Sequence, residues 1–198
     1  TITRVRRNLG RLVQTVAESS FDAWTKFYKQ DENAPNAIVS YYAKGALVAL
    51  ALDLTIRRHT EGVRSLDDVM RALWERHGKP AVGVPERGVE RVAAEVSGLD
   101  LEGFFAHALD STEDLDLSGL LTSVGVGVRM RPVRGPKDMG GVETEVKDEP
   151  VKPALGLRLQ PAGSEPLIGV VLTGSPAAEA GLAAGDLLVA LDGIRVSR

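Results

Sequence analysis

The first part of the chain carries apolar side chains at helical spacing. Residues 40–59 give the clearest case, because the apolar run from Gly45 to Leu52 leaves no polar face and predicts a helix buried in a core. Three cations follow it, Arg57, Arg58 and His59, and suit the negative end of a helix dipole. The same spacing predicts further helices over residues 9–17, 65–78, 85–97 and 101–109.

Residues 19–35 interrupt this helical pattern and contain four of the nine aromatic residues of the chain, Phe21, Trp24, Phe27 and Tyr28. We expect an irregular segment here. Aromatic side chains gain stability from the large apolar area that they bury. We therefore predict that this segment packs onto another part of the protein.

After Gly119 the period changes from helical to two. Residues 124–130 alternate between apolar side chains and Gly or Arg, which predicts a half-buried strand. Residues 132–153 are rich in proline, glycine and charge, so a mobile insertion or hairpin is expected there. Short strands are predicted over residues 155–159, 167–172 and 186–191, with one helical turn over residues 176–180. The pattern thus predicts an α+β protein with a helical part, residues 1–118, and a mostly β part, residues 119–198.

Composition excludes several classes of function. The 24 basic and 27 acidic residues among 198 give a net charge of only −3, so no overall field indicates binding to nucleic acid or to an anionic membrane. The absence of cysteine excludes disulfides, thiol nucleophiles and thiolate metal sites. No apolar run approaches the roughly 20 residues of a membrane span. The missing initiator methionine, and a motif cut short at Arg198, suggest part of a longer protein.

Residues 174–193, from Gly-Ser-Pro-Ala-Ala-Glu-Ala-Gly to Leu-Asp-Gly, contain signals for the start and the end of a short helix. Pro176 suits the first turn of a short helix and Gly181 suits its left-handed end. This stretch resembles the middle of a bacterial PDZ domain. The resemblance implies that the loop and strand start at Leu155, Gly156 and Leu157 offer backbone N–H groups to the carboxylate of a C-terminal peptide, which adds as an extra strand. The alternative is that Leu155 and Leu157 are simply core residues of a strand.

In that family a later helix forms the second wall of the peptide groove. The chain stops before a helix of that kind would begin, so the resemblance implies an incomplete PDZ module. An incomplete module exposes apolar strand faces and a strand edge. We therefore expect self-association of this chain.

Residues 17–62 contain Tyr42-Ala-Lys-Gly-Ala46 within Val-Ser-Tyr-Tyr-Ala-Lys-Gly-Ala-Leu-Val-Ala-Leu-Ala-Leu-Asp. This stretch resembles the glycyl aminopeptidase family of zinc metallopeptidases, in which a thermolysin-like catalytic domain precedes a PDZ domain. The resemblance implies that the Tyr42 phenol donates a hydrogen bond to the oxyanion formed when zinc-bound water attacks the peptide carbonyl. Tyr41 points about 100° away around the helix and is expected to be structural. The alternative is that both tyrosines only pack at a helix start.

The zinc ligands of that family are missing from this sequence. Its three histidines, His59, His77 and His107, have no partner at i+3 or i+4, and none opens a His-Glu-x-x-His motif. The ligands and the glutamate base are therefore expected upstream of Thr1, so this chain alone should bind no zinc and be inactive. The parent protein is expected to be a bacterial aminopeptidase that removes small N-terminal residues such as Gly or Ala, in the periplasm or the cytoplasm. The rival interpretation is a non-catalytic adaptor, helical plus PDZ, that captures C-terminal peptides.

Overall fold

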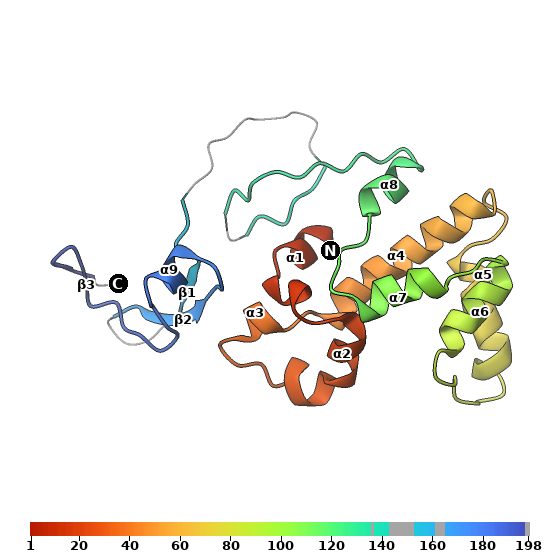
Figure 1. Ribbon diagram of the computed structural model, residues 1–198, viewed down its shortest axis with the longest axis horizontal. Helices are drawn as coiled ribbons and strands as arrows, with labels where there is room; N and C mark the ends of the chain where they lie inside the picture. The colour runs from red at the N-terminus through yellow and green to blue at the C-terminus, as the bar shows by residue number, and fades with distance from the viewer. Residues whose placement is uncertain (136, 143–152, 161–164, 197–198) are drawn as a thin grey trace. The chain divides into compact units, whose positions relative to one another are not determined.

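A computed structural model describes residues 1–135, 137–142, 153–160 and 165–196 of the chain (Figure 1). Helices occupy the N-terminal part, and small antiparallel sheets lie near the C-terminus, so the predicted α+β class is confirmed. The chain divides into two compact units. The first contains Thr1, residues 15–20 and residues 40–130, and the second contains residues 2–14, 21–39 and 131–198. The predicted boundary between residues 118 and 119 remains a prediction.

The first unit is helical and is built around α4. Its elements are α2 (Val16–Phe21, whose last residue falls in the second unit), α4 (Tyr41–His59), α5 (Leu66–Leu73), a π-helix (Trp74–Gly78), α6 (Gly88–Ser97), α7 (Glu102–Asp110) and α8 (Leu117–Thr122). Figure 1 shows α4, α5, α6 and α7 next to one another. Their apolar faces form one core from Leu52, Ile56, Val69, Val92, Ala93, Leu101 and Phe105. This burial is the main stabilising contribution to the unit.

The helix ends of the first unit follow the signals in the sequence. The Ser40 hydroxyl accepts a hydrogen bond from the N–H of Ala43 at 3.2 Å and caps α4. A capping box of Ser65 and Asp68 begins α5. Gly98 ends α6 in the left-handed conformation, with φ of 70°.

The helices of the second unit are short. Those before residue 40 are α1 (Ile2–Arg6), a 3₁₀-helix (Leu9–Leu12), a π-helix (Ala23–Phe27) and α3 (Ala34–Ala37). Gly10 is buried, and a Cβ placed on it would overlap the backbone of Ile38, so only glycine allows this close approach. The Gln14 side chain, also buried, accepts a hydrogen bond from the N–H of Val39 at 3.1 Å. These contacts fix the segment that follows α3.

The strands form two small antiparallel sheets. In the first, β1 (Leu157–Gln160) pairs with β2 (Leu167–Val171), and a register shift between Arg158 and Leu159 marks a bulge. In the second, β3 (Ala190–Leu191) pairs with β4 (Ile194–Arg195) across a two-residue turn. Asp192 and Gly193 in that turn both have positive φ, the pattern of a type I′ hairpin. Along the chain, α9 (Pro176–Glu179) lies between β2 and β3. Gly181 follows it with φ of 79°, as predicted.

Three expectations about local structure were wrong. Residues 124–130 form no strand, because no neighbouring strand pairs with them among the described residues. The aromatic segment is not packed away, since Phe21 is 91% and Trp24 is 78% exposed. The helix of residues 40–59 is buried on only part of its surface, because Tyr42 and Ala46 are exposed.

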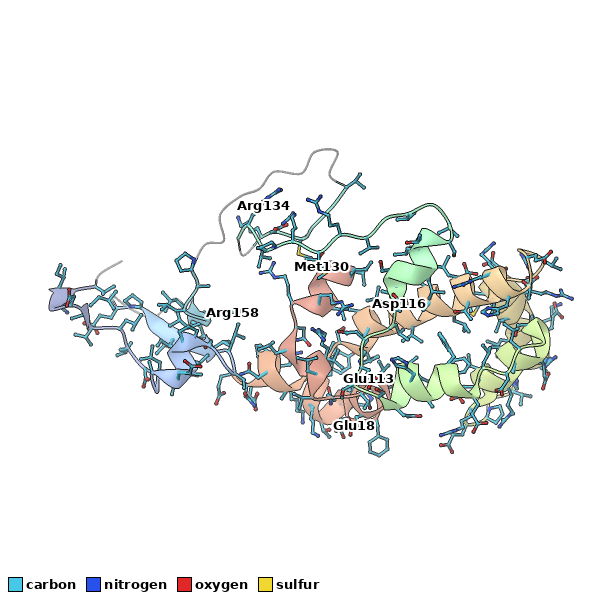
Figure 2. The ribbon with its side chains drawn as sticks, turned by 45° about the horizontal axis from the view of Figure 1, so that its top comes forward. Glu18, Glu113, Asp116, Met130, Arg134 and Arg158 are labelled. Carbon is cyan, nitrogen blue, oxygen red and sulfur yellow. The ribbon has the colours of Figure 1, made fainter. Side chains whose placement is uncertain are left out.

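Half of the predicted insertion, residues 132–153, lies outside the described residues. Its described part turns around Asp138. The Asp138 carboxylate accepts hydrogen bonds from the Arg131 guanidinium at 2.6 and 3.2 Å and from the N–H groups of Arg134 and Gly140 at 2.9 Å each. Its backbone oxygen accepts one from Arg7 at 2.6 Å. These donors, the Arg131 guanidinium foremost, hold the pKa of Asp138 well below its ordinary value. Figure 2 labels Arg134 in this segment.

One stretch of the described residues, Ala34–His59, is long and apolar enough to cross a membrane by length and composition alone. Core helices of globular domains satisfy the same criterion, and Leu52 and Ile56 of this stretch belong to the core of the first unit.

Candidate functional site

Tyr42, the predicted catalytic residue, lies in the first turn of α4. The Ser40 cap fixes the direction in which this helix begins. Tyr42 is 60% exposed, whereas Lys44 and Leu47 further along the same helix are buried. A phenol can both donate and accept a hydrogen bond, so a tyrosine at this position has the chemistry that the family resemblance implies.

The ring of Tyr41 lies against the ring of Tyr42. Their centroids are 4.2 Å apart and the ring planes are inclined by 30°. Contacts of this kind between aromatic rings add stability beyond the area they bury. Tyr41 therefore packs against Tyr42, and its predicted structural role stays a prediction.

The three histidines lie apart on different helices. His59, in the last turn of α4, has its Nδ1 2.9 Å from the backbone oxygen of Thr55. His77 lies in the π-helix Trp74–Gly78, and His107 of α7 has its Nε2 3.7 Å from the Glu113 carboxylate. Within the described ranges no group of three His, Cys, Asp or Glu side chains could hold a metal ion. The residues that the structure describes therefore do not fit a zinc site.

The predicted peptide-binding loop is built around Gly156. Gly156 has φ of 77°, and a Cβ placed on it would overlap the side chain of Ser175. Its carbonyl oxygen accepts a hydrogen bond from the N–H of Leu172 at 2.7 Å, and the carbonyl oxygen of Leu155 accepts one from Ala177 at 3.0 Å. Hydrogen bonds from the segment that follows β2 and from the start of α9 thus fix the backbone of this loop.

This loop leaves donors and a strand edge available. Among the described residues, the N–H groups of Leu155 and Gly156 have no hydrogen-bond partner. Within the same part of the chain β1 pairs only with β2, so its other edge is open to a further strand. Arg158 lies on this strand (Figure 2). Leu155 is exposed and Leu157 is half-buried, so neither is a core residue. An open edge beside free N–H groups can receive an extended peptide.

Comparison with known proteins supports the two resemblances. Residues 1–48 match the family model of the M61 glycyl aminopeptidases, and residues 167–198 match that of the PDZ domain. The chain is thus similar to M61 glycyl aminopeptidases at its start and to PDZ domains at its end. The first match includes Tyr42, and the second includes β2, α9, β3 and β4.

A solved structure agrees with both matches. It is the crystal structure of an aminopeptidase N family protein from Idiomarina loihiensis, with 38% sequence identity and a TM-score of 0.85. The similarity covers 99% of this chain and 33% of that protein, so the chain spans about a third of the length of this relative. No curated protein gives a significant match.

Sequence reasoning proposed Tyr42 and the loop of Leu155, Gly156 and Leu157 from their motifs, and these site assignments stay predictions. It missed Asn36, whose side chain bonds to the backbone of Val171 and Thr173. The local sequence, Asn-Ala-Pro-Asn, suggests only a turn, and its partners lie more than 130 residues away. No signal in the sequence alone points to this contact.

Proposed function

We propose that the chain belongs to an aminopeptidase in which Tyr42 stabilises the oxyanion of the reacting peptide bond. The observation that carries this proposal is the position of Tyr42: it lies within the segment that matches the M61 family, on a capped helix start, and the residue is 60% exposed. The phenol would donate its proton in a hydrogen bond to the oxygen on which negative charge develops. Removing one such donor typically costs about 3 to 4 kcal/mol of transition-state stabilisation.

The proposal includes zinc dependence and a preference for small N-terminal residues such as Gly and Ala, as the family resemblance implies. The described residues do not supply a metal site. We propose, as the family resemblance implies, that the zinc ligands and the general base lie in a part of the protein outside this chain. This chain would contribute the oxyanion donor and the PDZ module.

We further propose that, in a PDZ domain whose groove is completed by the later helix, the loop of Leu155, Gly156 and Leu157 binds the carboxylate of a C-terminal peptide. The N–H groups of Leu155 and Gly156 and the open edge of β1 support this assignment. The peptide backbone would pair with β1 as an added strand. This binding also suits the rival function, an adaptor without catalytic activity, so the two candidates differ only in hydrolysis.

A hydrolysis assay on the full-length protein tests the proposed function. We expect release of Gly and Ala from aminoacyl amides, with activity lost on chelation and restored by zinc. A protein that hydrolyses none of a full set of aminoacyl amides, yet binds a C-terminal peptide, would be an adaptor. Titration of a C-terminal peptide library, with C-terminally amidated copies as controls, tests the carboxylate loop separately.

A further inference from the structure

The side-chain amide of Asn36 is bonded on both of its polar atoms to the backbone that follows β2. Its Nδ2 donates to the carbonyl oxygen of Val171 at 2.9 Å, and its Oδ1 accepts from the N–H of Thr173 at 3.0 Å. The second hydrogen on Nδ2 donates to Oδ1 of Asn33 at 3.0 Å. All four residues lie in the second unit. The two backbone groups decide the orientation of the amide, because the Val171 carbonyl can only accept and the Thr173 N–H can only donate a hydrogen bond.

The two backbone groups bonded to the Asn36 side chain are spaced like those that pair with a neighbouring parallel strand. They are the carbonyl of residue i and the N–H of residue i+2, which is the pair that a single residue of a parallel strand takes in a β-ladder. The Asn36 side chain therefore makes the same two hydrogen bonds as one residue of a neighbouring parallel strand would make.

The position of Asn36 relative to β1 follows from the residue between its two partners. Leu172 donates its N–H to the carbonyl oxygen of Gly156 at 2.7 Å, on the β1 side. Backbone groups of successive residues in an extended segment point to opposite edges, so Val171 and Thr173 present theirs on the side away from β1. Asn36 occupies that far side, and the open edge of β1 stays available.

Asn36 is carried by a firmly held segment. It lies in α3 directly after Pro35, whose ring fixes φ, and its own N–H donates to the carbonyl oxygen of Asn33 at 2.9 Å. Ala34 beside it is buried, with only 3% of its surface exposed. The amide is therefore a fixed point against which the backbone of residues 171–173 is held.

We propose that Asn36 is a positioning residue that joins the peptidase-family segment to the carboxylate-binding loop of the PDZ domain. Asn36 lies within the M61 match and its partners lie within the PDZ match. The connection runs from the Asn36 amide to Val171 and Thr173, and from Leu172 between them to Gly156. Because Asn36 and a bound peptide would use different edges, both can be engaged at the same time. The statement that this loop binds a peptide rests on the proposed function, whereas the connection itself does not.

Backbone hydrogen exchange on the whole chain, without peptide, tests this connection. Asn36→Asp nearly preserves size but removes the donor and sets a carboxylate against the Val171 carbonyl. We expect the amides of Thr173 and Leu172 to exchange roughly tenfold faster or more, while the amide of Ile56 in the core of the first unit keeps its protection. The matched control is Gln30→Glu, the same chemical change at a side chain whose amide donates to Phe27. This control should leave the exchange rates of the Thr173 and Leu172 amides unchanged.

A second variant, Asn36→Ala, removes the same hydrogen bonds without adding charge and should give the same pattern. The proposal is overturned if Thr173 and Leu172 exchange at the wild-type rate in both variants. It is also overturned if only Thr173 changes, because the contact then stops short of the loop, or if Ile56 loses protection equally, because Asn36 then supports the fold in general. No peptide is present, so failure of the loop to bind peptides leaves these outcomes unchanged.

Discussion

Gly156 and Ser175 lie so close together that a side chain on Gly156 would overlap the Cβ of Ser175. Ser175 is itself fixed, because it is buried and its hydroxyl accepts a hydrogen bond from the N–H of Ala178 at 3.3 Å to cap α9. The loop that is proposed to bind a carboxylate can therefore approach α9 only with glycine at this position.

Gly156→Ala should destabilise the PDZ part by about 2 kcal/mol or more. An alanine at this position would have to adopt a positive φ, which costs roughly 1 to 2 kcal/mol, and its Cβ would overlap the side chain of Ser175. Urea denaturation followed by a probe in residues 153–196 measures the change. The control is Gly103→Ala in α7, where a Cβ has open space and should stabilise the helix by about 0.5 to 1 kcal/mol. Equal effects of the two substitutions would contradict this account of Gly156.

Asp138 should make the stability of the second unit sensitive to acid. Its pKa in the folded protein lies below the ordinary value of 3.8, because Arg131 and two backbone N–H groups bond to the carboxylate. Its contribution is therefore fully present above that ordinary value, and is lost as the pH falls below it towards the folded-state pKa. Asp138→Asn should lower Tm at pH 7 and flatten the fall of Tm between pH 5 and pH 2. Parallel Tm curves for the two proteins would refute this role.

The 198-residue chain is expected to bind zinc no more tightly than micromolar. The prediction follows from the scattered positions of His59, His77 and His107, and from the lack of a metal-binding group in the described ranges. Elemental analysis after dialysis against a weak chelator measures it. Stoichiometric zinc that survives this dialysis would show that the chain has a site of its own.

The chain should also self-associate through the PDZ part. Leu159 on β1 is 51% exposed, and β1 has an edge that no described strand covers. An open edge with apolar side chains favours pairing with a second copy. Sedimentation velocity should show dimers that dissociate in Leu159→Lys but persist in the control Leu12→Lys, whose side chain is equally exposed on a different element. A wild-type chain that is monomeric at every concentration would disprove the expectation.

Much of this structure is readable from local sequence signals. Ser40, Ser65 and Gly98 mark helix ends because a cap depends on residues only a few positions away. Residues 124–130 show the limit of such reasoning: their alternation fits a strand, but a strand also needs a partner, and Gly125 has φ of 79° instead of an extended backbone. Pairing is a property of the whole fold.

The candidate site divides in the same way. Tyr42 and Gly156 belong to motifs whose residues are neighbours in the chain, so the sequence was sufficient to propose them. The part played by Asn36 depends on backbone groups of Val171 and Thr173. Almost any residue type could provide those groups, proline at position 173 excepted, and so the sequence around Val171 and Thr173 gives no sign of the pairing.

The most direct test of the account is the kcat of the full-length protein with Tyr42→Phe, measured on a Gly or Ala amide. We expect kcat to fall by about 10²-fold or more with zinc content and fold unchanged, because only the oxyanion donor is removed. Tyr41→Phe is the matched control: its ring still contacts that of Tyr42, and its kcat should stay within a few-fold of wild type. An unchanged kcat in Tyr42→Phe would contradict the catalytic assignment and leave Tyr42 as a packing residue at the start of α4.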